Sequence, residues 1–197
     1  FSDAKILLAQ ILNEKLLTAK AVFGIFPANA IGDDIEVYAD TARDEVNVQF
    51  LTLRQQSKKK EGIANIALAD FIAPKETGIE DYIGAFCVAI FGADELAGKY
   101  KETHDDYNAI LVQAVADRFA EAFAEYLHKQ IRTKHWGYSK HENLRNEELI
   151  KEAYTGIRPA PGYPACPDHL EKDTIWQLLD VEKIIGVKLT ESRAMWP

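Results

Sequence analysis

Residues 111–131 read LVQAVADRFAEAFAEYLHKQI, and this stretch decides what kind of fold the chain can adopt. Its large apolar side chains recur at four-residue steps, which predicts a long α-helix with one buried face. The stripe consists of Leu111, Val115, Phe119, Phe123, Leu127 and Ile131, widened by Ala114, Ala122 and Tyr126. The helical pattern begins at Asp94 and ends near His135. A capping box formed by Thr103 and Asp106, with Asp in place of the usual Glu, predicts that a second helix starts within it.

The sequence before this helical region alternates apolar and polar side chains, as half-buried strands do. Ala21–Phe26 and Ile35–Ala39 are predicted to pair as a hairpin around turn-forming residues at 32–34. Glu45–Leu53 alternates in the same way and predicts a further strand. Asp81–Phe91 has almost no polar face, so we expect it to be a central strand buried on both sides.

Helices are also expected near both ends of the chain. Asp3–Leu17 carries apolar residues at helical spacing. Short helical patterns follow the long helix at Glu147–Tyr154, Thr174–Leu179 and Val181–Ile185, and Gly186 ends the last of them. Ile63–Ala73 is apolar and alanine-rich, and its period does not separate helix from strand. Because the strands precede the long helices rather than alternate with them, the prediction is an α+β fold. We expect a mainly antiparallel twisted sheet in a single domain over residues 1–197.

Composition excludes several classes of function. The chain has 197 residues, and 23 Lys and Arg against 31 Asp and Glu give a formal charge of −8. Nucleic-acid binding needs a basic surface, so no nucleic-acid partner is expected, and residues 58–60, all lysine, are interpreted as a solvated connection. The longest apolar runs are far shorter than the roughly 20 residues that cross a bilayer, so no membrane association is expected. Cys87 and Cys166 lie far apart, which favours reduced thiols in a cytoplasmic protein.

The most unusual stretch is Gly156–His169, where four prolines fall within nine residues. No helix or central strand tolerates that density of proline, so we expect an extended, stiff loop. Such a loop loses little entropy when it orders around a ligand. Arg158 offers a planar guanidinium that matches a carboxylate or phosphate in two parallel hydrogen bonds, and Tyr163 supplies an aromatic face. From composition alone, a rigid connector packed on the surface is an equally good interpretation.

The segment Arg158–His169 also carries a family resemblance, together with shorter pieces in the same order along the chain. These pieces are FPAN at 26–29, GDDIE at 32–36, LRQQ at 53–56, LADF at 68–71, HDDYN at 104–108, ADR at 116–118 and LTES at 189–192. With them, the chain strongly resembles the C-terminal activation domain of cobalamin-dependent methionine synthase. The matches run from near the first residue to the last, and the proline-rich segment is far more specific than a single short motif.

The resemblance implies a module that binds S-adenosylmethionine and supports the reductive methylation of cob(II)alamin to methylcobalamin during methionine biosynthesis. In the family, flavodoxin or an equivalent reductase supplies the electron, and a neighbouring cobalamin-binding domain of the same enzyme holds the cobalamin. The chain is thus expected to be part of a methyltransferase that moves a methyl group from 5-methyltetrahydrofolate to homocysteine, and not a complete enzyme by itself. The alternative is a stand-alone binding or interaction protein that kept the fold without catalytic partners.

The resemblance also implies a ligand site. The family's arginine that holds the ligand's carboxylate falls on Arg158, and the backbone around Gly162, Tyr163 and Ala165 is expected to line the adenosine. No catalytic residue is assigned, because methyl transfer from a sulfonium to cobalt needs no protein nucleophile, and Cys166 is interpreted as a small packed side chain. Family members carry flanking segments that also contact the ligand. These segments are expected to be missing from residues 1–197, so we expect weaker affinity from these residues alone.

A stripe of carboxylates lies along the long helix at Asp117, Glu121 and Glu125. A solvated face is one interpretation, and Lys129 would partly relieve the repulsion by pairing with Glu125. The resemblance favours contact with the cobalamin-binding domain, with Asp117 as the first candidate and Glu121 as the second. The His and Cys residues lack the spacing of a zinc site, so no bound metal is expected.

Overall fold

The structure is a computed structural model that describes residues 2–196. It has the predicted α+β fold, with a four-stranded sheet in the order β3-β2-β1-β4 and antiparallel pairing of β1 with β2 and of β2 with β3. The chain divides into two compact units. Unit 1 contains the residues up to Val22 and Cys87–His141, and unit 2 contains Phe23–Phe86 and Glu142–Trp196. Each unit has its own core and is described separately.

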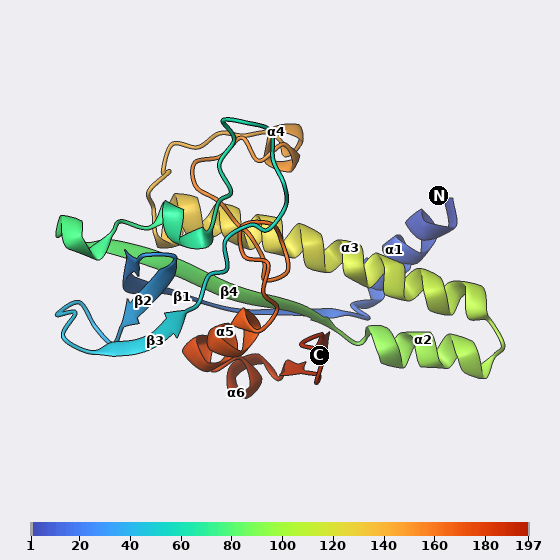
Figure 1. The fold of residues 1–197 in the computed structure, drawn as a ribbon. Coiled ribbons are helices and arrows are strands. Elements are labelled where there is room, and N and C mark those ends of the chain that lie inside the picture. The colour runs from blue at the N-terminus through green and yellow to red at the C-terminus, as the bar shows by residue number, and fades with distance from the viewer. Residues whose placement is uncertain (1, 197) are drawn as a thin grey trace. The chain divides into compact units, whose positions relative to one another are not determined.

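Unit 1 is mainly helical. It contains α1 (Ser2–Glu14), α2 (Ala93–Glu102) and α3 (Asp106–Gln130), and a π-helical turn at residues 131–135 continues α3. Helices α2 and α3 lie side by side (Figure 1). The core is formed where α1, α2 and α3 meet, and its buried members are Leu7, Ile11, Ala97, Ala109 and Val112.

The start and the buried face of α3 differ from the prediction. Asp105 is the N-cap, and its carboxylate accepts the backbone N–H of Asn108 at 3.1 Å, so the expected pair of Thr103 and Asp106 is wrong. The small residues Ala109, Val112 and Ala116 are buried, whereas Leu111, Val115, Phe119 and Phe123 are only partly buried and Ala122 and Tyr126 are exposed. Four residues turn a helix by about 400°, so a strict four-residue stripe drifts by about 40° at each step.

The π-helical turn after α3 directs a charged side chain inward. The N–H of Trp136 reaches back five residues to the carbonyl of Ile131 at 2.9 Å, which widens the helix locally. Arg132 in this turn is fully buried, and its Nη1 lies 2.5 Å from Nδ1 of His128. Because a guanidinium only donates, Nδ1 accepts, and the imidazole is held as the tautomer that carries its proton on Nε2.

Unit 2 is built around the sheet. Its strands are β1 (Thr18–Ile31), β2 (Asp34–Tyr38), β3 (Val46–Phe50) and β4 (Asp81–Phe91), of which β1 and β4 also extend into unit 1. Ile31 pairs with Asp34, so β1 and β2 form the predicted hairpin around Gly32 and Asp33. β1 is longer than predicted and runs through Pro27. The core on the sheet consists of Ala28, Ala30, Ile35, Val37, Val48, Phe50, Ala69 and Ile83.

β4 has the predicted bounds but a different place in the sheet. It is an edge strand next to β1, so the predicted central position is wrong. Its burial also alternates: Ile83, Ala85, Cys87 and Ala89 are buried, while the residues between them are partly buried or exposed. An apolar run reports how many side chains avoid water. It carries no information on how many strands are hydrogen-bonded beside it.

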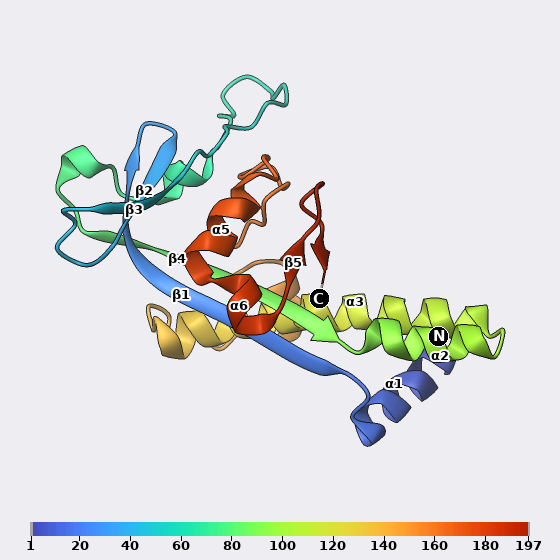
Figure 2. The same ribbon diagram turned by 90° about the horizontal axis from the view of Figure 1, so that it is seen from below.

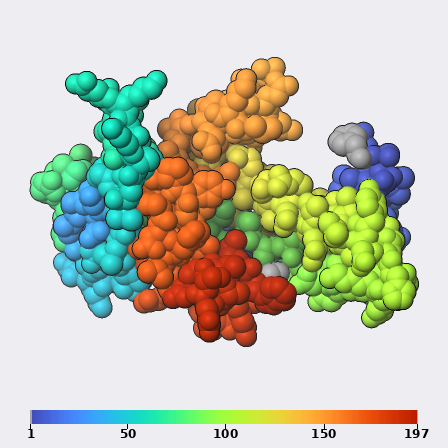
Figure 3. Space-filling model, turned by 45° about the vertical axis from the view of Figure 1, so that its right-hand side comes forward, coloured from blue at the N-terminus to red at the C-terminus, as the bar shows by residue number. Residues whose placement is uncertain are grey.

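Two arginines organise the loops beside the sheet. Arg43 donates to the side-chain oxygen of Asn29 at 2.9 Å and to the carbonyl of Asp81 at 2.7 Å. Arg54 bridges the carboxylates of Asp33 and Asp70, at 2.5 and 2.7 Å. Between Arg54 and the 3₁₀ turn at Leu68–Phe71 the chain has no regular structure, and this segment projects from unit 2 in the space-filling view (Figure 3).

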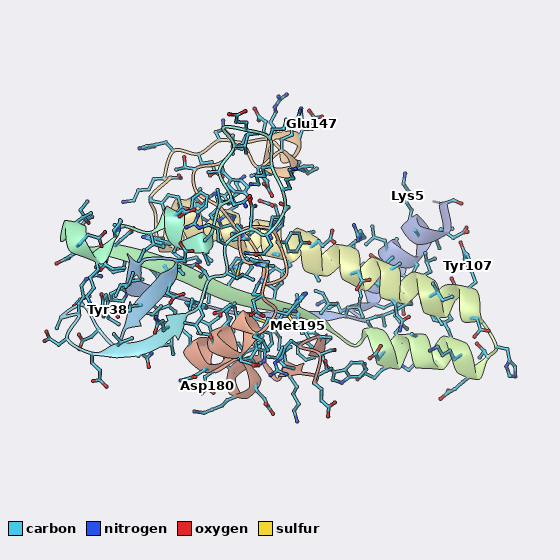
Figure 4. The ribbon with its side chains drawn as sticks, in the orientation of Figure 1. Lys5, Tyr38, Tyr107, Glu147, Asp180 and Met195 are labelled. Atoms are coloured by element: carbon cyan, nitrogen blue, oxygen red, sulfur yellow. The ribbon has the colours of Figure 1, made fainter. Side chains whose placement is uncertain are left out.

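The remaining elements of unit 2 are short. They are a second 3₁₀ turn (Lys75–Thr77), α4 (Asn146–Ile150), α5 (Glu171–Leu179), α6 (Val181–Ile185), β5 (Lys188–Leu189) and β6 (Met195–Trp196). Asp180, labelled in Figure 4, joins α5 to α6 in a left-handed conformation, and Gly186 ends α6 as predicted, with φ of 83°. The indole N–H of Trp176 donates to the carbonyl of Val187 at 2.9 Å and ties α5 to the chain after α6. Figure 2 shows α5, α6 and β5 following one another.

Candidate functional site

The proline-rich segment at residues 156–169, named the proline loop below, connects α4 to α5 in unit 2. It folds into two consecutive β-turns. In the first, the N–H of Tyr163 donates to the carbonyl of Ala160 at 3.0 Å, with Pro161 and Gly162 at the turn's centre. In the second, the N–H of Cys166 donates to the carbonyl of Tyr163 at 2.9 Å. The expectation of an extended loop is therefore wrong, because a proline at the second position of each turn favours folding back.

Gly162 closes the loop, and a side chain lies against one side of its backbone. Its N–H donates to the carbonyl of Cys166 at 2.8 Å, which joins the two turns. Its φ of +102° lies in the region that favours glycine. A Cβ placed there would meet the imidazole of His169 at 2.3 Å. The ring of His169 thus packs on the Gly162 backbone and supports the turns from one side.

The predicted ligand residues differ in exposure. Tyr163 is 64% exposed and Gly162 is also exposed, whereas Ala165 is partly buried. Arg158 is half-buried, and its Nε atom is shielded from solvent. The loop therefore presents the exposed ring of Tyr163 and the exposed backbone of Gly162 on one short turn. A few residues earlier, Arg158 has a guanidinium whose Nε atom is shielded from solvent.

Cys166 is a packed side chain, as predicted. It is 4% exposed, and its thiol is free, as is that of Cys87. Burial, with smaller contributions from Glu171 and Asp168, raises the pKa of Cys166 to about 11. The reactive thiolate is therefore scarce near neutral pH, which argues against a nucleophilic role.

The C-terminal end of the proline loop is anchored to α5. The carboxylate of Asp168 accepts the N–H of Leu170 at 2.8 Å, just before α5 begins at Glu171. Further along, Arg193 pairs with Asp173 on α5 at 2.8 Å, and Lys172 donates to the carbonyl of Arg193 at 2.8 Å. The loop therefore ends on an element with several polar attachments.

The carboxylates predicted to contact the cobalamin-binding domain lie in the other unit. Asp117 and Glu121 are exposed on α3 in unit 1, one helical turn apart. Glu121 pairs with Arg118 at 3.0 Å in a solvent-exposed ion pair. Glu125 is partly buried. Both candidates are thus accessible, although Glu121 already has a cationic neighbour on the same helix.

Unit 1 also contains an apolar groove of about 490 Å³. It is lined by Ile11, Leu12, Lys15, Leu17, Thr18, Ala19, Ile90 and Phe119, and it includes none of the predicted site residues. Within residues 2–196, no group of three or more His, Cys, Asp or Glu side chains is arranged to hold a metal ion. Within the same range, no helix is long and apolar enough to cross a membrane.

Comparison with known proteins places this architecture. A sequence model of the family described as "Vitamin B12 dependent methionine synthase, activation domain" matches residues 1–197. The chain belongs to this family. A crystal structure described as the MetH reactivation domain bound to AdoHcy is 58% identical, with a TM-score of 0.94. The match covers all of this activation-domain chain and 61% of the length of that solved chain. The predicted family is confirmed, and so is the α+β fold.

Two residues of this activation domain support the loop at its base but were not predicted from the sequence as site residues. His169 supports Gly162, and Glu171 is buried next to Cys166 and Asp168. The Pro161-Gly162 pair is a sequence signal for a turn that presents glycine with positive φ, so the folded shape of the loop was predictable. Nothing in the local pattern indicates that Glu171 is buried, because Glu at a helix start is usually solvated.

Proposed function

We propose that the chain is the S-adenosylmethionine-binding activation module of a cobalamin-dependent methionine synthase, with Arg158, Gly162, Tyr163 and Ala165 as its contacts to the ligand. The observation that carries the proposal is the proline loop itself. It combines a partly buried guanidinium with an exposed ring on a turn fixed by Gly162. The AdoHcy described for the 58% identical structure supports the same class of ligand.

The residues of the proline loop fit a zwitterionic sulfonium ligand. The guanidinium of Arg158 can pair with the ligand's carboxylate in a charge-assisted, two-point contact. The exposed ring of Tyr163 offers a face for stacking against adenine or for attracting the sulfonium. The thiol of Cys166 stays out of the chemistry because burial keeps it protonated. The chain's contribution is thus to bind and orient the methyl donor.

The reaction that this module supports is the reductive methylation of cob(II)alamin. Cobalamin bound by a neighbouring domain would supply the metal chemistry, and the residues of the proline loop would hold the methyl donor for it. The electron donor is flavodoxin or an equivalent reductase, and the product left on the proline loop is S-adenosylhomocysteine. The cytoplasm is the proposed location, in keeping with two free thiols among the described residues.

Replacing Arg158 tests the ligand assignment. Arg158→Gln is expected to weaken S-adenosylhomocysteine binding by about 10- to 100-fold, since it removes a charge-assisted contact of about 1.5–3 kcal/mol. The same variant is expected to leave the affinity for 5′-methylthioadenosine, which lacks the carboxylate, nearly unchanged. Calorimetric titration of both ligands measures the difference. Equal weakening of the two ligands would show that Arg158 does not contact the carboxylate.

The surface for the cobalamin-binding domain is proposed at Asp117 and Glu121, where a carboxylate would receive the histidine released from cobalt. Asp117→Asn in an intact enzyme is expected to slow reactivation of the oxidised cofactor, because it removes one negative charge from an exposed site. Glu95→Gln, an exposed carboxylate at the start of α2, is the matched control. Reactivation rates that are the same for both variants and wild type would return these residues to an ordinary solvated surface.

A further inference from the structure

Glu171 is a buried carboxyl group that the ligand assignment does not use. It is the first residue of α5 and is only 5% exposed. Its Oε1 atom accepts the backbone N–H of Leu51 at 3.2 Å. Its Oε2 atom is also buried and makes no hydrogen bond of ordinary length and angle within residues 2–196. A buried carboxylate oxygen without a donor is costly, so a specific role is expected for this side chain.

The position of Glu171 connects the proline loop to the sheet. The residue follows the loop's last residue, His169, by two positions, and Leu51 directly follows β3. Ile175 and Leu178 on the same helix pack against the core of the sheet. Glu171 is therefore the polar contact that ties the start of α5, and with it the end of the proline loop, to the end of β3.

The charges around Glu171 disfavour its ionised form. Asp168 from the proline loop and Asp34 from β2 are both negative neighbours, and the thiol of Cys166 is close by. Burial is the largest effect and raises the pKa of Glu171. The hydrogen bond from the N–H of Leu51 lowers the pKa, and the negative charge of Asp168 raises it. The hydroxyl of Thr174 opposes the rise and Asp34 adds to it. Burial and these neighbours together make the protonated form of Glu171 more favourable here than in water.

We propose that Glu171 is a positioning residue of the ligand site: as a neutral carboxyl group it holds the end of the proline loop against β3, and its ionisation loosens the loop. This inference rests on the proposed function for its meaning in catalysis, since the loop it holds is the one assigned to S-adenosylmethionine. The structural part concerns the free protein alone. Residue Glu171 acts through the turns at Gly162 and Cys166 and does not itself contact the ligand.

The sign of the pH effect follows from the burial of Glu171. When the loop opens, Glu171 returns to water and to the ordinary acidity of a glutamate. The closed loop therefore binds more protons than the open loop, and the closed state becomes less stable as the pH rises. The loss begins above the ordinary pKa of Glu, about 4.3, and ends above the raised pKa. On the order of a tenfold change in the opening equilibrium corresponds to each pH unit inside this interval.

Hydrogen exchange of three amides tests the proposal without any ligand. The N–H groups of Gly162, Tyr163 and Cys166 are all hydrogen-bonded within the turns, so their protection reports whether the loop is closed. In the wild-type protein, protection corrected for intrinsic exchange is expected to fall progressively between about pH 4 and pH 8 and to level off once Glu171 is ionised. In Glu171→Gln, which keeps an oxygen for the N–H of Leu51, protection is expected to stay constant over that range.

Two comparisons make this test decisive. Glu182→Gln, an exposed carboxylate on α6 that pairs with Lys188 at 3.4 Å, is expected to behave like wild type. In the wild-type protein, the carboxyl ¹³C shift of Glu171 is expected to titrate with the same midpoint as the protection, whatever happens to the variants.

The proposal is overturned if Glu171→Gln and wild type show the same pH dependence, or if the Glu171 carboxyl titrates with a different midpoint from the three amides. Failure of the proposed function would look different. In that case the loop would respond to the ionisation of Glu171 as described, while S-adenosylmethionine added to the same samples would leave the protection of Gly162, Tyr163 and Cys166 unchanged.

Discussion

At the scale of single residues, Gly162 combines two requirements that no other residue type meets. Its φ of +102° disfavours any side chain, and the imidazole of His169 occupies the space that a Cβ would need. Gly162→Ala is expected to lower the free energy of unfolding by about 1–3 kcal/mol, measured by urea denaturation. The change is also expected to lower affinity for the ligand, because the turn that carries Tyr163 must shift.

Gly32 provides the matched control for this substitution. Its φ is +61°, but no atom lies within 4 Å of the place where its Cβ would be. Gly32→Ala is therefore expected to lose only the backbone contribution, about 1 kcal/mol. If both variants lose the same free energy of unfolding, the contact between His169 and Gly162 does not stabilise the loop.

Residue-level prediction succeeded where the chemistry is local. The packed thiol of Cys166 and the capping glycine at Gly186 followed from residue type and context. The cap of α3 did not, because Thr103, Asp105 and Asp106 can all cap a helix and only the backbone path selects Asp105. Glu171 was missed for the related reason that burial depends on α5 packing against β3, which no neighbouring residue reveals.

At the scale of elements, Arg54 fixes the long connection between β3 and β4. Its guanidinium joins Asp33 at the hairpin turn to Asp70 in the first 3₁₀ turn, and it also donates to the carbonyl of Asn65 at 2.8 Å. The hydrogen bond from Arg54 is the largest effect on Asp70 and lowers its pKa. An aspartate whose pKa is lowered by folding stabilises the protein at neutral pH and loses that effect as the pH falls.

Arg54→Gln is expected to lower stability at neutral pH and to flatten the fall in stability on acidification below about pH 4, where Asp70 becomes protonated. Thermal unfolding followed by circular dichroism across this range measures both effects. Arg145→Gln, which removes an exposed ion pair with Glu148 of 3.2 Å, is expected to change little. Parallel acid profiles for Arg54→Gln and wild type would contradict the assigned role.

The sequence largely predicts which helices and strands form. It does not predict which elements lie next to one another in the fold. The bounds of β4 were read from its apolar run, and the hairpin of β1 and β2 from its turn residues. The edge position of β4 depends on strand order, which hydrophobic periodicity does not encode. The predicted buried face of α3 differs from the observed one because the prediction rests on large apolar side chains. Helices in close contact bury small residues, such as Ala109 and Ala116.

At the scale of the whole molecule, the organisation into two units was not visible in the sequence. Two of the three crossings between the units lie within β1 and β4, and the third lies at residues 141–142, in the connection between the π-helical turn and α4. Composition therefore shows no boundary within these strands. The two predicted sets of functional residues lie in different units. The proline loop is in unit 2, and Asp117 and Glu121 are in unit 1.

Part of the net charge of −8 can be assigned to a particular surface of the molecule. It first served to exclude nucleic acid, and part of it now belongs to the exposed carboxylates of α3 that are proposed to face the cobalamin-binding domain. The match to 61% of the solved relative's length leaves further segments of that relative outside the comparison.

The most direct test of the central claim is an amide NMR titration of this chain with S-adenosylmethionine up to about 1 mM, a range that detects even weak binding. Shifts are expected to centre on the proline loop, at Arg158, Gly162, Tyr163 and Ala165. Arg158→Gln is expected to reduce these shifts sharply, and Arg145→Gln is expected to preserve them. Shifts centred instead on the groove of unit 1, or undiminished in Arg158→Gln, would contradict the claim that this loop is the ligand site.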